Sequence, residues 1–472
     1  MNIKQLRQTI LGRAIRGQLV SQDPTDEPAS VLLERIRAEK EELIKEKKLK
    51  REKRDSQPIE EVPFEIPEGW VWCRLGDISL INPKNNLNDE LDVSFIPMSL
   101  ISEGFSNVHT SEVKKWKNIK ERYTHFCNED IGIAKITPCF ENRKSVIFNN
   151  LKNGVGAGTT ELYILRNNKT ISFNKYLFWV VKTQEFINKG IESFTGAVGQ
   201  QRVSKDFIEN TLIPLPPLAE QHRIVQKIEQ LFALVDIIEV NKKALEKLIE
   251  QAKSQVLSDA VAGKLTHQDP NDEPAEELLK RIGKTTAPDT PYEKMLPKGW
   301  AWCRLGDIGI INPKNNLNDE LEVSFIPMAL ISEGFSNAYT YEVKKWKNIK
   351  KGYTHFCNED IGIAKITPCF ENRKSVIFNN LKNGVGAGTT ELYILRSNKT
   401  LSFNKYIFYF VKTQEFINNG IKGFTGAVGQ QRISRYFIEN TLIPLPPLAE
   451  QHRIVKKIET YFSFFDTIES NL

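Results

Sequence analysis

The sequence predicts an α+β protein in which two similar globular domains are separated by a pair of long antiparallel helices. Residues 69–225 align without a gap to residues 299–455 at a constant offset of 230, with 21 differences over 157 positions. Each copy contains short β-branched and aromatic runs bounded by Asn-, Gly- and Pro-rich turns, as expected of strands. The segment between the copies has helical periodicity and contains no Pro or Gly until Gly263.

The repeat and its linkers divide the chain into seven segments. In order, they are an N-terminal helix (1–20), a charged linker (21–62), the first globular domain (63–217), a central helix (218–265), a second linker (266–294), the second domain (295–447) and a distal helix (448–472).

Within the first domain, four runs predict strands and one predicts a helix. The helix follows from the apolar periodicity of 176–190. The strands are predicted at 93–98, 131–136, 145–148 and 161–165, and the second domain repeats them at the same offset.

The central helix carries a heptad pattern of apolar residues. Pro216 and Pro217 exclude a helix upstream and set its start at Leu218. About 48 residues at about 1.5 Å each give a rod of about 70 Å. Its seam, which predicts a coiled coil, contains Ile224, Ile228, Leu231, Val235, Ile238, Leu245 and Ile249.

The distal helix begins the same pattern, with Ile454, Ile458, Tyr461, Phe465 and Ile468 on the seam, and then the chain ends. A second repeat, 17–29 against 263–275, has an offset of 246, so the N-terminal helix matches the missing end of the distal helix. The sequence therefore predicts a circularly permuted pseudo-two-fold repeat. Because an apolar stripe must be buried, the two helical rods are expected to pair antiparallel.

Composition restricts the class of protein. The net charge of +6 permits a polyanionic partner. There is no apolar run near the ~20 residues of a membrane span, and the N-terminus does not resemble a signal peptide. The six cysteines form no CxxC pair and predict reduced thiols in a cytoplasmic protein. The charged run 37–54, absent from the second linker, predicts a solvated helix or an additional contact to DNA or a partner.

Three loops have side chains suited to nucleic acid. In the first, amides can pair with adenine and a lysine can reach phosphate or guanine, although a polar turn explains it equally well. This loop contains Asn82, Lys84, Asn85 and Asn86, with Asn312, Lys314, Asn315 and Asn316 in the second copy.

The second candidate places lysines around Trp116, which suits phosphate neutralisation or a solvated basic face. These are Lys114, Lys115 and Lys117, repeated as Lys344, Lys345 and Lys347.

The third loop combines glycines with two amides and a guanidinium, the groups that read adenine and guanine edges. It contains Thr195, Gly199, Gln200, Gln201 and Arg202, repeated as Thr425, Gly429, Gln430, Gln431 and Arg432. A further Gly-rich stretch, 154–160, lacks GK[ST] and predicts a tight turn more than a phosphate loop.

Catalytic motifs are missing from the sequence. We find no HExxH, GxSxG or Walker A motif, no S-adenosylmethionine loop, and no clustering of the six histidines at metal spacing. The chain is expected to recognise a partner without catalysing a reaction or binding a metal.

Specific motifs resemble a known family. Residues 213–224 (IPLPPLAEQHRI), repeated at 443–454, resemble the signature that ends each target-recognition domain of type I restriction-modification specificity subunits (HsdS). Residues 69–77, 130–140 and the Gly-Gln-Gln-Arg loop also resemble that family, as does the order of domains and helices. The resemblance covers nearly the whole chain.

The resemblance implies that each domain reads one half of a split double-stranded DNA site. It also implies that the helices set the spacer and dock two methyltransferase subunits (HsdM), and that two HsdR motor subunits can join. The cofactors S-adenosylmethionine, ATP and Mg²⁺ would belong to these partners. Members of the family usually have dissimilar domains, so two nearly identical ones predict a bipartite near-palindromic site.

Two alternatives use the same observations. A stand-alone DNA-binding regulator would bind its site tightly without partners, and a pure assembly scaffold would bind protein through its coiled coil. Should the half-sites differ, the least conservative differences between the copies are the first positions to examine: His109/Tyr339, Ser111/Tyr341, Glu121/Lys351, Arg122/Gly352 and Asp206/Tyr436.

Overall fold

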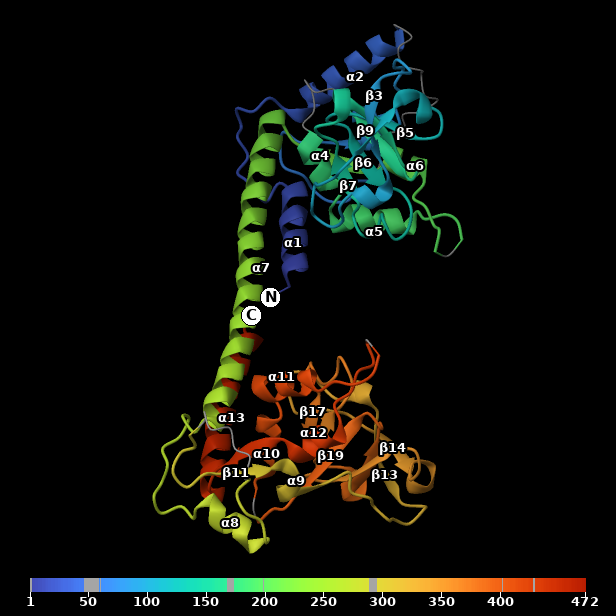
Figure 1. The fold of residues 1–472 in the computed structure, drawn as a ribbon. Coiled ribbons are helices and arrows are strands. Elements are labelled where there is room, and N and C mark those ends of the chain that lie inside the picture. Colours follow the sequence, from blue (N-terminus) through green and yellow to red (C-terminus); the bar gives the residue numbers. More distant parts are fainter. Residues whose placement is uncertain are drawn as a thin grey trace. The chain divides into compact units, whose positions relative to one another are not determined.

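The protein consists of two units that share one long helix. The computed structural model describes residues 2–45, 59, 61–167, 174–197, 199–287, 295–400, 402–427 and 429–472. It divides into two compact units, Met1–Asn241 and Lys242–Leu472. The boundary falls inside the longest helix, α7 (Leu218–Val261), which begins in unit 1 and ends in unit 2 (Figure 1).

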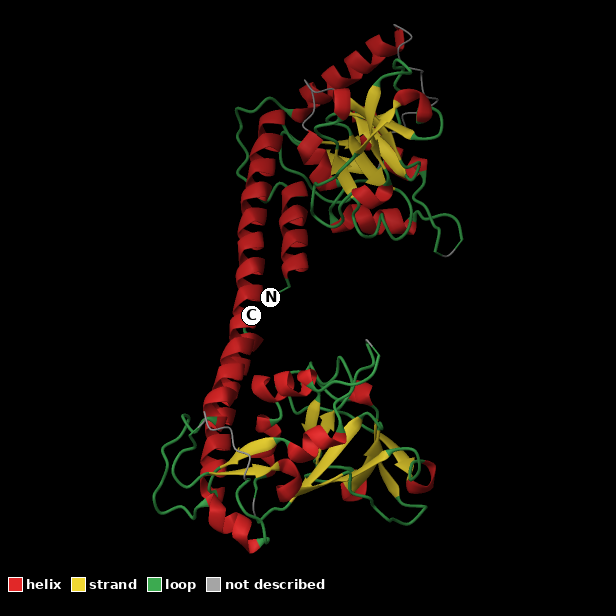
Figure 2. Ribbon diagram, in the orientation of Figure 1, coloured by secondary structure: helices red, strands yellow, loops and turns green. Residues whose placement is uncertain are grey.

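Unit 1 is a mixed α/β unit with most of its helices outside its sheets (Figure 2). Its helices before α7 are α1 (Ile3–Ile15), α2 (Ala29–Lys45), α3 (Leu75–Ile78), α4 (Asn174–Val180), α5 (Gln184–Glu192) and α6 (Lys205–Asn210), with 3₁₀ turns η1 (Met98–Leu100), η2 (Trp116–Asn118) and η3 (Lys152–Gly154). Its strands are β1 (Val71–Arg74), β2 (Leu80–Ile81), β3 (Asp92–Ile96), β4 (Glu112–Lys115), β5 (Thr124–Cys127), β6 (Ile131–Ala134), β7 (Ser145–Ile147), β8 (Val155–Gly158), β9 (Leu162–Arg166) and β10 (Leu212–Leu215).

The strands of unit 1 form three small sheets, ordered β1-β10, β2-β9-β6-β7 and β4-β3-β8-β5. All pairs are antiparallel except β3 with β8, where Ser94 lies opposite Gly156. The four predicted strands correspond to β3, β6, β7 and β9, each within two residues of the predicted ends.

Unit 2 repeats this arrangement at the offset of 230, except that α8 begins at the position that matches the start of α2 at the offset of 246. Its helices are α8 (Ala275–Arg281), α9 (Leu305–Ile308), α10 (Asn404–Phe410), α11 (Gln414–Lys422), α12 (Arg435–Asn440) and α13 (Leu448–Ser470), with η4 (Met328–Leu330), η5 (Trp346–Asn348) and η6 (Lys382–Gly384). Its strands are β11 (Ala301–Arg304), β12 (Gly309–Ile311), β13 (Glu322–Ile326), β14 (Glu342–Lys345), β15 (Thr354–Cys357), β16 (Ile361–Ala364), β17 (Ser375–Ile377), β18 (Val385–Gly388), β19 (Leu392–Ser397) and β20 (Leu442–Leu445). Two similar α+β domains and a long helix are therefore confirmed.

In each unit the globular domain, called the head below, is packed against two helices. In unit 1, α1 lies beside the first part of α7 (Figure 1), and Arg7 contacts Asp236 and Glu239 of α7. In unit 2, Lys253 in the last part of α7 contacts Asp466 and Glu469 of α13. Lys253 matches Arg7 at the offset of 246, and the four acidic residues match at 230.

The buried face of the helices departs from the predicted seam. Ile224, Ile228 and Val235 are buried as expected, but Ile238 is 40% exposed and Phe232, not Leu231, fills the intervening position. In α13 the corresponding buried residue is Phe462 rather than Tyr461, whereas Phe465 and Ile468 are half-buried. Farther along α7, Leu245 is half-buried and Ile249 is buried. The surface packed against each stretch of the helix, rather than a uniform heptad count, therefore selects the buried residues.

Two other predictions require correction. The helix expected at 176–190 is two helices, α4 and α5, because the Thr183 hydroxyl accepts from Phe186 N and caps a new helix start. The Gly-rich stretch 154–160 is mostly strand β8, not a tight turn or phosphate loop. A side chain at Gly158 would lie 2.1 Å from the carbonyl oxygen of Ile96, so glycine permits the close pairing of β3 with β8.

Helix α1 ends at Ile15, five residues before the predicted end, whereas α7 begins at the predicted Leu218. The central helix ends at Val261. Gly263, two residues later, has a left-handed backbone (φ +68), as does Gly17 after α1 (φ +67). Of the charged run 37–54, residues up to Lys45 belong to α2, and the rest lies outside the described residues. Of the helices in the described part of the chain, none combines the length and apolarity that a membrane span requires.

Burial predicts which side chains on α7 stabilise unit 1. Ile228 is 0% exposed and Leu234 is 56% exposed. Ile228→Ala should lower the free energy of unfolding by about 2–5 kcal/mol because it leaves a cavity. Leu234→Ala should change it by less than about 0.5 kcal/mol. Urea denaturation of the two variants measures both values, and equal destabilisation would contradict this packing.

Candidate nucleic-acid interface

Strand β9 holds two of the three candidate loops, one at each end. Loop 82–86 follows β2 and is bonded to β9 through Ile164, whose N–H donates to Asn82 Oδ1 (2.9 Å). Loop 195–202 is bonded at the other end, where Arg202 binds Glu161 just before β9. Arg166, at the end of β9, also bonds loop 82–86 through Asn85. At about 3.3 Å per residue, Glu161 lies about 10 Å from Ile164 and about 16 Å from Arg166. The two loops are therefore bonded to different parts of β9.

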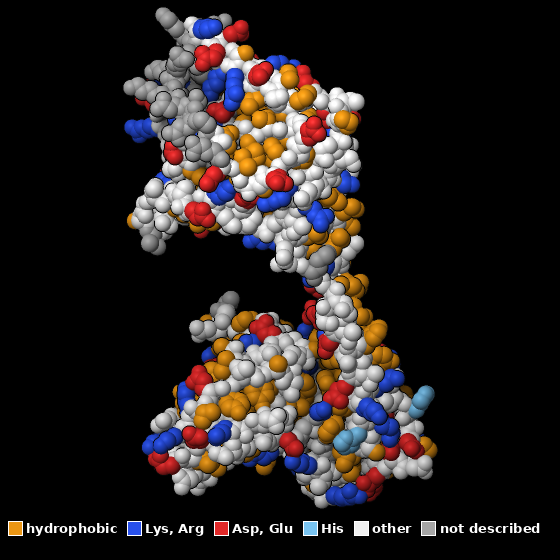
Figure 3. Space-filling view, turned by 180° about the vertical axis from the view of Figure 1, so that it is seen from behind, with side chains coloured by type: hydrophobic (Ala, Val, Ile, Leu, Met, Phe, Trp, Pro, Cys, Tyr) orange, Lys and Arg blue, Asp and Glu red, His pale blue; other side chains and the backbone are white. Residues whose placement is uncertain are grey.

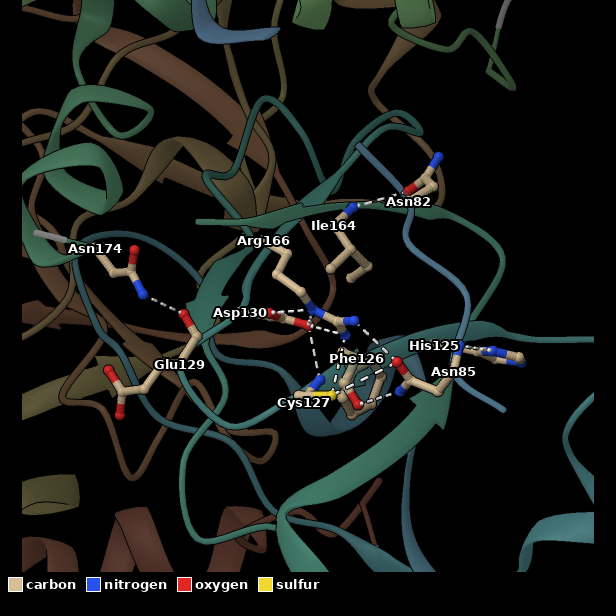
Figure 4. Close-up of polar contacts among 10 residues, drawn as sticks. All are labelled: Asn82, Asn85, His125, Phe126, Cys127, Glu129, Asp130, Ile164, Arg166 and Asn174. Atoms are coloured by element: carbon tan, nitrogen blue, oxygen red, sulfur yellow. Dashed lines mark hydrogen bonds and ion pairs between the residues drawn. The ribbon is translucent and has the colours of Figure 1, made fainter. Parts of the chain in front are cut away.

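Two amides of loop 82–86, those of Asn82 and Asn85, are hydrogen-bonded within the head (Figure 4). Asn85 Oδ1 accepts from Arg166 Nη1 (3.0 Å), and Asn85 Nδ2 donates to the carbonyl oxygen of Phe126 (3.2 Å). Asn82, at φ +53, holds the turn by accepting from β9. Lys84 and Asn86 are the exposed members of the loop. Of the four candidates, only these two have exposed side chains.

Arg166, which the sequence analysis did not single out, organises this network (Figure 4). Its guanidinium forms a two-point ion pair with Asp130, at 3.0 Å from Nε to Oδ1 and 2.7 Å from Nη2 to Oδ2. Nη2 is also 3.0 Å from Cys127 Sγ. Such planar pairs are strong and directional, so they fix β5, β9 and loop 82–86 together. The only sequence signal was an arginine ending an apolar strand.

In unit 2 the equivalent residues make the same arrangement. Arg396 binds Asp360, and its Nη2 donates to Asn315 Oδ1 (3.3 Å). Asn312 Oδ1 accepts from Ile394 N (2.9 Å), while Lys314 and Asn316 are exposed.

The lysines around Trp116 are already paired with acidic side chains. The Lys114, Lys115 and Lys117 ammonium groups lie 2.7–3.1 Å from the carboxylates of Glu112, Asp92 and Glu90. Trp116 itself is 1% exposed and belongs to the core. Binding of phosphate here would require these lysines to exchange their carboxylate partners.

The second copy of this patch is similar. Lys344 pairs with Glu342, and both Lys345 and Lys347 pair with Glu320. Hydrogen bonds from Lys345 and Lys347 lower the pKa of Glu320 to about 2.

Loop 195–202 is an exposed hairpin closed by its last residue. Thr195 and Arg202 exchange backbone hydrogen bonds of 2.9 and 3.0 Å. The Arg202 guanidinium donates to both oxygens of Glu161 (2.9 and 3.0 Å) and, through Nη1, to the carbonyl oxygen of Gln200 (3.2 Å). Arg202 therefore closes the loop. Between the closing residues, Gly199 (φ +86) and Gln200 are exposed and Gln201 is half-buried.

The hairpin recurs in unit 2 with the same contacts. Thr425 and Arg432 pair through the backbone, and Arg432 binds Glu391 at 2.9 and 3.0 Å. Gly429 and Gln430 are exposed and Gln431 is half-buried. Val198 and Val428 lie outside the described residues.

One difference between the heads is structurally neutral. Asn149 N donates to His109 Nε2 (3.1 Å), and the matching Asn379 N donates to Tyr339 Oη (2.7 Å). Either side chain thus satisfies the same backbone group. Among the other differences, Tyr436 is 74% exposed on α12. It is a stronger candidate than Tyr339 for unequal contacts of the two heads.

The signature at the start of α7 joins distant segments. Glu220 accepts hydrogen bonds from Trp70 Nε1 (2.9 Å) and Gln22 Nε2 (3.1 Å), and Arg223 binds Asp26. The start of α13 makes the same contacts in unit 2. Glu450 accepts hydrogen bonds from Trp300 and Gln268, and Arg453 binds Asp272. The motif residues of 69–77 and 213–224 therefore meet in the fold, through Trp70 and Glu220.

None of the six cysteines forms a disulfide; Cys73 and Cys303 are buried, and the other four are half-buried. Burial raises the pKa of the Cys73 thiol well above its ordinary value. The described residues contain no group of three His, Cys, Asp or Glu side chains placed to hold a metal ion.

Two nearly identical heads with exposed polar hairpins define a two-headed binding protein. The model of the family described as "Type I restriction modification DNA specificity domain" matches this chain twice, at residues 67–247 and 297–472. The chain is 37% identical to the type I restriction enzyme EcoAI specificity subunit of Escherichia coli, covering 97% of this chain and 88% of that one. It is 36% identical to the EcoEI specificity subunit of the same organism, covering 100% and 91%.

A solved structure shows the same fold. The HsdS subunit from Thermoanaerobacter tengcongensis has a TM-score of 0.56 at 20% identity, covering 87% of this chain and 93% of that one. The chain belongs to the family of type I restriction-modification specificity subunits, which confirms the resemblance seen in its motifs.

The structure predicts different effects for neighbouring asparagines. Asn85→Ala removes the hydrogen bonds to Arg166 Nη1 and to the Phe126 carbonyl oxygen and should lower the free energy of unfolding by about 1–3 kcal/mol. The exposed Asn86→Ala should change it by less than about 0.5 kcal/mol. Chemical denaturation measures both. A destabilised Asn86 variant beside an unaffected Asn85 variant would refute the assignment.

The Glu161–Arg202 pair should make the hairpin sensitive to acid. The hydrogen bond from Arg202 lowers the pKa of Glu161. The pair therefore stabilises the native state above the ordinary carboxyl pKa, and this contribution is lost as pH falls through the lowered native pKa. The difference in unfolding free energy between wild type and E161Q should be about 0.2–1 kcal/mol at neutral pH and shrink in acid. Denaturation at several pH values tests this, and a difference independent of pH would contradict it.

Proposed function

We propose that this chain is the DNA-recognition subunit of a type I restriction-modification complex and that each head reads one half of a bipartite site. The observation that carries this proposal is the pair of exposed hairpins, 195–202 and 425–432. Both present glutamine amides, which suit adenine edges in the major groove. The sequence relatives named as specificity subunits support the same role.

The two half-sites should be nearly identical and inverted. The hairpin, loop 82–86 and the supporting arginine network have the same sequence in both heads, so both heads offer the same groups to DNA. Lys84 and Lys314 supply charge for phosphate contacts. The target is therefore a near-palindrome with an unread spacer.

The chain is, in this proposal, a circularly permuted two-fold repeat with paired antiparallel helices. The contacts of Arg7 with Asp236 and of Lys253 with Asp466 support it, because they are equivalent contacts within separate units. In unit 1 the first part of α7 occupies the place that α13 occupies in unit 2. In unit 2 the last part of α7 occupies the place of α1.

Two methyltransferase subunits would dock on the helices. Hydrophobic side chains are exposed along them (Figure 3), including Leu234, Ile237 and Val240 in unit 1 and Leu248 and Phe464 in unit 2. Apolar surface of this kind marks a protein interface. Leu234 and Phe464 are equivalent positions, so each unit offers a similar site to one copy of the partner.

Catalysis and cofactors are assigned to the partners. S-adenosylmethionine would be bound by the methyltransferase subunits, and ATP and Mg²⁺ by HsdR motor subunits where a restriction complex forms. This chain supplies sequence recognition and the docking helices, and the complex would act on cytoplasmic DNA. A stand-alone regulator is the alternative: it would bind the same DNA tightly without a methyltransferase.

Sequencing the methylome of cells that express this chain with its methyltransferase tests the proposal. We expect one bipartite motif with matching inverted halves. Gln200→Ala with Gln201→Ala should weaken recognition of one half-site by about 1–3 kcal/mol per lost base contact. The same changes at Gln430 and Gln431 should do so equally for the other half.

Unrelated sequences in the two halves would refute the symmetry. Methylation unaffected by all four glutamine changes would refute the hairpins as readers. Tight, specific binding by the isolated chain, unchanged on adding methyltransferase, would favour the regulator.

A further inference from the structure

A buried lysine holds together three segments of each head. Lys182 is 0% exposed. Its ammonium group donates to the carbonyl oxygens of Gly104 (2.7 Å), Ser106 (3.0 Å) and Arg143 (2.9 Å). All three donors of the ammonium are therefore used. Burial lowers the pKa of Lys182 to about 7, whereas three carbonyl partners favour its charged form.

Arg143 closes the same arrangement from the other side. Its Nε donates to the carbonyl oxygen of Lys182 (3.1 Å). The residue is 4% exposed, and its backbone is in the left-handed conformation (φ +56). The guanidinium also lies 5.4 Å from the ring centre of Phe105. Phe105 stands between Gly104 and Ser106, the two residues that Lys182 holds. Its backbone is thus fixed on both sides.

Phe105 contacts the helices that carry the head. Its ring lies edge-on to Phe232 of α7, with 5.7 Å between ring centres. Arg7 of α1 lies 6.0 Å from the Phe105 ring and 5.7 Å from the Phe232 ring, and it pairs with acidic residues of α7. We call Phe105, Arg143, Lys182 and Phe232 the head–helix joint of unit 1.

Unit 2 has the same joint. Lys412 donates to Gly334, Ser336 and Arg373 at 2.6, 3.0 and 3.0 Å. Phe335 lies 5.6 Å from Phe462 of α13. The joint of unit 2 therefore consists of Phe335, Arg373, Lys412 and Phe462.

We propose that Lys182 and Lys412 are positioning residues that fix the tilt of each head on its helices, and that they thereby set the spacer length the protein accepts. This inference rests on the proposed reading of a bipartite site. A head of about 150 residues is about 30–40 Å across, so a tilt of about 7° moves its far side by about 3.5 Å. That displacement is close to one base-pair step of about 3.4 Å. A rigid joint is therefore needed to reject a spacer that is one base pair too long.

The test compares matched lysine variants in the assembled complex with methyltransferase. Lys182→Met with Lys412→Met removes the joint contacts. The control, Lys152→Met with Lys382→Met, changes exposed lysines in turns η3 and η6 of the heads, away from α7 and α13. A second joint variant, Phe105→Ala with Phe335→Ala, leaves the lysine contacts in place. Binding is measured at fixed salt on duplexes with the cognate spacer, with one base pair more or fewer, and with a single half-site.

We expect wild type and control to prefer the cognate spacer by about tenfold or more, a difference of about 1.4 kcal/mol. Both joint variants should reduce this preference to about threefold or less while binding the single half-site as wild type does. If the buried lysine variant does not fold, the phenylalanine variant gives the same comparison.

Unchanged spacer preference in the phenylalanine variant, or equal relaxation in the control, would overturn the joint proposal. Failure of the wild-type complex to prefer any bipartite duplex would instead overturn the proposed function on which it rests.

Discussion

At the first turn of each helix that carries a head, a buried glutamate binds parts of the chain far apart in sequence. Glu220 accepts from the Trp70 indole, which precedes the first strand, and from Gln22, which follows α1. Burial raises the pKa of Glu220, and a buried carboxyl group is costly unless it is hydrogen-bonded. The contact therefore requires head, linker and helix to be assembled together. Glu450 imposes the same requirement in unit 2.

The polar side chains of the head, which these contacts hold on its helix, fall into two groups. One group is hydrogen-bonded to other residues of the head and consists of Arg166, Arg202 and Asn85. Gln200 and Lys84 are exposed on segments that the first group holds in place. Such support is what recognition needs, because contacts to bases are specific only when their donors are held in position. In the proposed complex, the exposed apolar positions of α7 and α13 would bind a different partner on a different surface.

Sequence patterns predicted helices and strands well where neighbouring residues determine the local structure. Prolines placed the start of α7 at Leu218, and β-branched runs located β3, β6, β7 and β9. They failed where packing decides. Thr183 caps a new helix inside a continuous helical pattern. In the paired helices, Phe232 is buried in place of Leu231, because the partner surface, not the heptad count, selects the buried row.

The sequence by itself determined that the protein has two nearly equal heads, since 136 of 157 aligned positions are the same, and that a long helix joins them. Which candidate side chains are available to DNA was decided by the tertiary structure alone. Residue type defines the hydrogen bonds that a side chain can make. Only the folded surroundings determine whether those bonds are already made, as they are for Asn85 and Arg202, or remain exposed, as for Gln200.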